Sequence, residues 1–109
     1  ATLSTYTTND ILSFALDLDN NLIYVYKNGS VQNSGTGISI TAPSSVSSGF
    51  YFPAVGTNDN AAGTYEFNFG SPSFSISSGN TDGNGYGNFE YAVPSGYYSL
   101  NTKNLAEYG

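Results

Sequence analysis

The feature that most constrains the fold is a period of two in residues 10–29, DILSFALDLDNNLIYVYKNG. Apolar side chains occupy every second position from Leu12 to Leu18, and Ser, Ala and Asp take the positions between them. Successive side chains of a strand point to opposite faces of a sheet, so the pattern predicts a half-buried strand. The residues predicted to face the core are Leu12, Phe14, Leu16 and Leu18.

Two turn signals frame a second predicted strand. Asp19, Asn20 and Asn21 tolerate left-handed backbone and can hydrogen-bond their own main chain, so the chain is expected to reverse there. Residues 22–27 are rich in β-branched and aromatic side chains and end at Asn28-Gly29, a pair suited to a turn with positive φ at both central positions. The segment is therefore predicted to be a β-hairpin that enters another turn.

The rest of the chain contains shorter segments of the same kind. Residues 38–40 predict a brief strand, 50–55 an apolar strand whose aromatic rings enter the core, and 64–69 another half-buried strand. Residues 80–87 are interpreted as an open loop, and 88–93 are weakly strand-like. No stretch has apolar residues at helical spacing, so no helix of useful length is expected. The predicted fold class is all-β, an antiparallel β-sandwich of two sheets packed face to face.

Charge limits the partners of the chain. The net charge is −6, with two Lys and no Arg among 109 residues, so phosphate neutralisation is weak and nucleic-acid binding is not expected. No apolar run approaches the roughly 20 residues that span a bilayer, so membrane insertion is not expected either. Only 9% of the residues are charged, and such a neutral polar surface is typical of proteins that work outside cells or on particles.

Catalytic chemistry has few candidate residues. The chain has neither His nor Cys, which excludes triads built on either, and neither Lys lies in a Ser-x-x-Lys frame. Asp17 and Asp19 are the obvious carboxylate pair for a glycosidase, but two solvated carboxylates before a turn are the favoured interpretation. The same residues resemble the start of a calcium loop, yet Leu22 and Asn28 stand where the glycine and the bidentate glutamate are needed. We therefore expect no catalytic residue, no metal site and no cofactor.

Two loops, 56–63 and 80–87, are candidate binding sites. Tyrosine rings give contact area at low entropic cost, and Tyr86, between two glycines, is expected to be the exposed anchor. Phe89 and Tyr91 are instead interpreted as core residues. The candidate ligand-binding residues are Asn58, Asp59, Asn60, Asn84, Tyr86 and Tyr97.

Three ordered segments resemble the SPRY domain family. Residues 10–29 are similar to its run D-V-I-G-V-A-L-D-L-D-N-G-x-L-x-F-Y-K-N-G, residues 51–55 (YFPAV) to Y-Y-P-A-V, and residues 68–70 (NFG) to N-F-G. Residues 94–105, PSGYYSLNTKNL, resemble the tail P-S-G-Y-x-x-L-N-T-x-N-L of SPRY-like segments in bacteriophage structural proteins.

The resemblance implies a concanavalin A-like jelly-roll sandwich, of which this chain matches the second half. We expect residues 1–109 to form a single partial domain, with 94–109 as a tail segment and with the remaining strands preceding Ala1 or coming from another chain. A complete, self-closed sandwich would contradict this expectation.

SPRY modules are mostly interaction domains, so the resemblance also implies a function. The first hypothesis is a non-catalytic structural module of a phage virion or of a tail or fibre component, located on the virion or an extracellular surface. Its partners would be protein subunits of a homo-oligomer or particle. The alternative hypothesis is an adhesion domain that binds a host surface glycan or a peptide with its loop aromatics.

Overall fold

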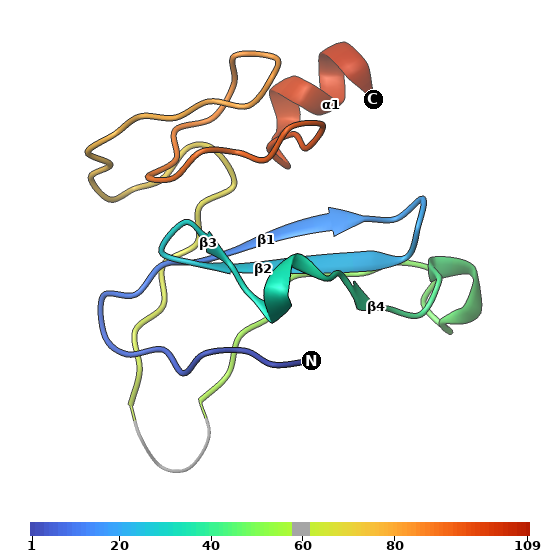
Figure 1. The fold of residues 1–109 in the computed structure, drawn as a ribbon. Coiled ribbons are helices and arrows are strands. Elements are labelled where there is room, and N and C mark those ends of the chain that lie inside the picture. Colours follow the sequence, from blue (N-terminus) through green and yellow to red (C-terminus); the bar gives the residue numbers. More distant parts are fainter. Residues whose placement is uncertain (58–61) are drawn as a thin grey trace.

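The computed structural model describes residues 1–57 and 62–109 (Figure 1). Four short strands lie in the first half of the chain, with two 3₁₀ turns between and after them, and one α-helix lies at the C-terminal end. In chain order the elements are β1 (Leu12–Asp17), β2 (Leu22–Lys27), β3 (Ser30–Val31), η1 (Asn33–Gly35), β4 (Ile38–Ser39), η2 (Pro43–Ser45) and α1 (Thr102–Tyr108).

The strands form one open antiparallel sheet. β1 pairs with β2 along its whole length, from Leu12 opposite Lys27 to Asp17 opposite Leu22. β3 and β4 both pair with the other side of β2, so β1 is an edge strand. The predicted hairpin is thereby confirmed.

Local turn chemistry sets this register. Asn28 and Gly29 have φ of 47° and 79°, the positive values that the Asn-Gly pair predicts for the β2–β3 turn. At the β1–β2 turn Asn21 has φ of 55°. The Asp17 carboxylate accepts two hydrogen bonds from Asn20, one from its backbone N–H at 3.0 Å and one from its side-chain amide at 2.8 Å. Both reversals lie where the sequence places them.

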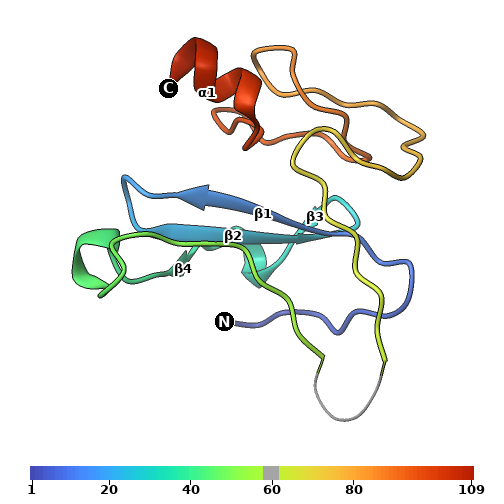
Figure 2. The ribbon, with the colours of Figure 1, turned by 180° about the vertical axis from the view of Figure 1, so that it is seen from behind.

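The two faces of the sheet have different neighbours. The C-terminal segment and α1 lie on one side of the sheet, and the N-terminal segment lies on the other, as the opposite views of Figures 1 and 2 both show. The covered face carries Ala15 and Tyr24, which are cross-strand neighbours. Tyr97 packs edge-on against Tyr24, with ring centroids 6.3 Å apart, and Tyr91 lines a small cleft beside Ala15. Ala15, 5% exposed, is the one buried hydrophobic residue in the described part of the chain.

The prediction of which face of β1 is buried was wrong. Phe14, Leu16 and Leu18, predicted to enter the core, are 62%, 43% and 47% exposed. The pattern separates two faces but does not say which one the chain covers. Here the C-terminal segment reaches the Ser13–Ala15 side, and among the described residues no second sheet lies over the other side.

Two further predictions were wrong, and both concern missing partners. Residues 50–55 and 64–69 are not strands, because within the described ranges neither segment has a strand to pair with. Phe50 and Phe52, whose rings were expected in the core, are 60% and 71% exposed, and Phe67 of the expected half-buried strand is 50% exposed. Of the weak strand expected at 88–93 only one bridge is present, between Asn80 and Phe89. The described residues form one open antiparallel sheet, and the second sheet of the predicted sandwich is not present among them.

The helix α1 was not predicted. It has seven residues, and its N-terminus is capped by Asn101, whose side-chain oxygen accepts a hydrogen bond from the backbone N–H of Asn104 at 2.9 Å. Asn is among the strongest N-cap residues, and the cap compensates for the poor apolar period of so short a helix. The tail segment therefore ends as a folded element.

Candidate interaction surface

The apolar side of β1 and β2 forms a surface that we call the open face. Cross-strand pairing places Phe14 opposite Val25 and Leu16 opposite Ile23, with Leu12 at the end of the same row. Side chains at alternate positions share a face, so these five residues form one apolar patch. Phe14 and Leu16 are the most exposed of them. A face of this kind is the surface that a sheet normally packs against another layer.

The N-terminal segment borders the open face without covering it. Leu3 and Tyr6 line a groove together with Leu12, Phe14 and Val25. Leu3 and Tyr6 are themselves 48% and 54% exposed. The apolar area thus extends from the strands onto a neighbouring segment, and extended exposed apolar patches on proteins mark interaction sites.

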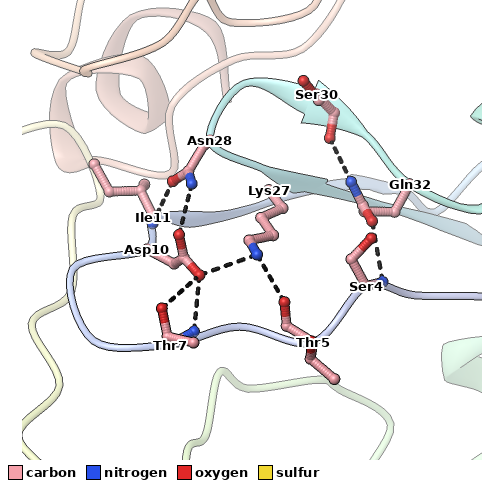
Figure 3. A network of polar contacts seen from close by, with 9 residues as sticks. All are labelled: Ser4, Thr5, Thr7, Asp10, Ile11, Lys27, Asn28, Ser30 and Gln32. Carbon is pink, nitrogen blue, oxygen red and sulfur yellow. Dashed lines mark hydrogen bonds and ion pairs between the residues drawn. The ribbon is translucent and has the colours of Figure 1, made fainter.

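Lys27 and Asp10 fasten this segment beneath the sheet (Figure 3). Lys27 Nζ donates to the backbone carbonyl of Thr5 at 2.7 Å and forms an ion pair with Asp10 at 3.1 Å. The Asp10 carboxylate also accepts from the backbone N–H of Thr7 at 2.7 Å and from the Asn28 amide at 2.6 Å. Thr7 first, then Asn28 and Lys27, lower the pKa of Asp10 to about 2. The border of the groove is therefore fixed by a charged network.

The backbone edge of β1 that faces away from β2 is unpaired, among the described residues, at Leu12, Phe14 and Leu16. Ile11 C=O accepts from the backbone N–H of Asn28 at 2.9 Å, so Ile11 and every second residue after it direct their backbone groups toward β2. The backbone groups of Leu12, Phe14 and Leu16 then point away from β2. In the described ranges no hydrogen bond reaches them. An unpaired edge beside an apolar face is a template for strand addition.

A second structured site lies in the C-terminal part, around the buried carboxylate of Asp82, which is 6% exposed. Its Oδ1 accepts from the backbone N–H groups of Asn84 at 2.9 Å and Tyr86 at 3.0 Å. Its Oδ2 accepts from Ser99 N at 2.9 Å, Ser99 Oγ at 2.7 Å and Asn104 Nδ2 at 2.7 Å. Both carboxylate oxygens therefore have full sets of donors.

These contacts determine what Asp82 can do chemically. Burial raises its pKa, but the hydrogen bonds donated by Ser99, Tyr86 and Asn104 outweigh burial and hold the pKa well below the usual range. An ionised carboxylate with five protein donors is an acceptor that organises its neighbours. It joins the 80–87 loop to the start of α1, and we define these parts, residues 80–109, as the Asp82 unit.

The three described candidate binding residues all belong to this unit or its contacts. Asn84 donates its side-chain amide to Asn104 Oδ1 at 2.8 Å. Tyr86 is half-buried against α1 rather than exposed as expected. Its hydroxyl donates to Glu107 at 2.5 Å, which raises the pKa of Tyr86 to about 12, and Lys103 Nζ lies 4.6 Å from its ring centroid. Tyr97 is half-buried against Tyr24, and burial raises its pKa.

The other three candidates, Asn58, Asp59 and Asn60, lie outside the described residues. The six candidates are therefore not shown to share one site. Sequence reasoning missed Asp82, Ser99 and Asn104, which form the best-buried polar cluster. The available signal was Asp82 before Gly83 and Asn84, because an aspartate in such a turn commonly accepts from the backbone two residues ahead.

The carboxylate pair considered for catalysis has a local role. Asp17 caps the turn through Asn20, which lowers its pKa, while Asp19 is exposed. Within residues 1–57 and 62–109 no three His, Cys, Asp or Glu side chains cluster as metal ligands. The described helix is too short to cross a membrane.

Comparison of the chain with models of protein families, with curated proteins and with solved structures found no match.

Proposed function

We propose that this chain is a non-catalytic interaction module of a larger protein assembly, and that its open face is the surface that another protein segment covers. One observation carries this proposal: the exposed row of Phe14 and Leu16 beside Ile23 and Val25, on an edge strand. Each large apolar side chain removed from water contributes roughly 1.5 to 3 kcal/mol, so covering this row would supply much of the free energy of an interface.

The setting that we propose is a phage virion or a tail or fibre component, with neighbouring protein subunits as partners. The resemblance of residues 94–105 to the tail of bacteriophage SPRY-like segments supports this setting. The alternative, a glycan or peptide site on the 80–87 loop, has less support. The side-chain polar groups of Asn84 and Tyr86 already bond Asn104 and Glu107, and a ligand would have to compete with these contacts.

A hydrophobic fluorescent dye tests the proposal without knowledge of the partner. We expect the dilute chain to enhance the fluorescence of anilinonaphthalene sulfonate, and the double variant F14Q/L16Q to enhance it less, because it lacks the two most exposed side chains of the open face. Y98Q is the matched control, because Tyr98 is a comparably exposed ring (57%) outside the open face. Circular dichroism would verify that all three proteins keep the same fold. Equal dye binding by F14Q/L16Q and the parent chain would contradict the proposed surface.

A further inference from the structure

We infer that a second copy of this chain adds its residues 64–69 as a strand to the edge of β1, beside the open face. The inference rests on the proposed function and names a partner for the edge that borders the open face. It starts from two features of the described residues: an edge that has no strand beside it among them, and a segment with strand periodicity that pairs with none of their strands.

The edge of β1 sets what its partner must be. On a strand, both the side-chain direction and the backbone hydrogen-bonding direction alternate with a period of two. On β1 the two coincide: Leu12, Phe14 and Leu16 direct their backbone groups to the open edge and their side chains to the open face. A strand that pairs there continues the apolar row only if apolar residues occupy every second position.

Residues 64–69, TYEFNF, meet this requirement. Tyr65, Phe67 and Phe69 alternate with Glu66 and Asn68, and the three rings are 42%, 50% and 41% exposed. The rings of Phe67 and Phe69 stack at 5.9 Å with 10° between their planes, so they already present one apolar side. The segment has strand-forming residues but no ladder partner among the described residues.

The segment does not pair with β1 of its own molecule. Its end is tied to the C-terminal part, because Asn68 donates to the Asn88 carbonyl at 2.8 Å and accepts from Gly70 N at 2.8 Å. When each copy adds its residues 64–69 to the β1 edge of the other, the two copies form a closed, two-fold symmetric dimer. Each copy then gives one strand and receives one.

Charge predicts how the association responds to salt. The contact row Leu12, Phe14 and Leu16 is uncharged, while each copy carries a net charge of −6. Like net charges oppose association at low ionic strength, and at 0.1 M, salt screens the repulsion between charges more than about 10 Å apart. The dimer is therefore expected to become tighter as salt is added.

Sedimentation velocity with a complementation design tests the inference on the full chain. We expect the parent chain to dimerise with a dissociation constant below about 100 μM. F14D, which damages the face, and F67D, which damages the segment, should each raise this constant at least roughly tenfold. An equimolar mixture of the two should recover part of the association, because one of the two exchanges in the mixed dimer joins the intact segment of F14D to the intact face of F67D. Y98D should behave as the parent chain.

Each result decides the question. A parent chain that stays monomeric at 100 μM and at high salt, or F67D that dimerises normally, overturns the inference. In either case a loss of dye binding in F14Q/L16Q would leave the proposed function standing, so the two failures are distinguishable. If circular dichroism shows that F14D is misfolded, F14T, which keeps strand propensity, replaces it in the same mixture.

Discussion

In the sheet region, residues 1–57, large apolar side chains face solvent, whereas in the C-terminal region, residues 70–109, the best-buried side chains are polar. Phe14 and Phe52 are 62% and 71% exposed, while Asp82, Ser99 and Asn104 are 6%, 7% and 8% exposed. Both regions expose large apolar side chains, Leu100 by 74% among them, and the buried polar cluster lies in the C-terminal region.

The difference teaches where each region gets its stability. The Asp82 unit satisfies its buried carboxylate internally, because that carboxylate has five donors within 3.0 Å. The sheet has a complete β1–β2 ladder but little hydrophobic burial, so it gains from any layer placed on its open face. A change at Asp82 should therefore act within the chain, and a change at Phe14 should act between chains.

The largest effect is expected from D82A. This variant leaves the backbone N–H groups of Tyr86 and Ser99 without their acceptor, whereas the Asn104 amide keeps the Ser99 carbonyl at 2.9 Å. The expected cost is roughly 3 kcal/mol in the free energy of unfolding of the Asp82 unit. Hydrogen exchange should show lost protection at Tyr86 and Ser99, with unchanged protection of the β1–β2 ladder. D82N, which keeps one carbonyl acceptor, should lose less. Equal loss of protection in the sheet would show that the two regions do not differ in this way.

A smaller effect is expected where the two regions touch, at Gly29. A Cβ there would lie 2.7 Å from the Tyr91 ring, and φ is +79°. G29A is expected to lower the free energy of unfolding by about 2 kcal/mol, from left-handed backbone strain plus the displaced ring. G85A is the matched control, since φ is +81° but no atom lies within 4 Å, so it should cost only about 1 kcal/mol. Thermal unfolding that ranks the two variants equally would remove the steric part of the explanation.

The hairpin could be predicted from the sequence because its determinants are local. Period two in residues 12–18 and Asn28-Gly29 act over a few neighbours, and the observed register and positive φ values follow from them. The same alternation could not say which face is covered. That choice depends on Tyr91 and Tyr97, which reach the sheet from the far end of the chain.

The Asp82 unit could not be predicted because its contacts are not local. Asp82 meets Ser99 and Asn104 across separations of 17 and 22 residues, and no periodic pattern encodes such polar contacts. The strand predicted at residues 64–69 is absent for a related reason. Alternation describes the side chains of a strand, but a strand also needs a neighbouring backbone to pair with. For α1 the only local signal was the capping Asn101.

The smallest effect is expected from acid, and it sharpens the comparison between the regions. Hydrogen bonds from Thr7 and Asn28 and the charge of Lys27 lower the pKa of Asp10 from 3.8 to about 2. A folded-state pKa below the unfolded value means that the contribution of Asp10 is complete above about pH 4 and disappears as the pH falls toward 2. The N-terminal segment should then loosen from Lys27 and widen the groove beside Leu12, while Asp82, whose pKa is held lower still, keeps its unit closed.

Amide chemical shifts followed by NMR between pH 5 and 2 measure this order. Thr7 N–H, which donates to Asp10, should titrate near pH 2, and Ser99 N–H, which donates to Asp82, should not yet move. D10N should remove the transition at Thr7 and leave Ser99 unchanged. If Ser99 titrates first, the polar unit is the weaker of the two regions in acid, because its carboxylate would then lose its donors before the surface network does.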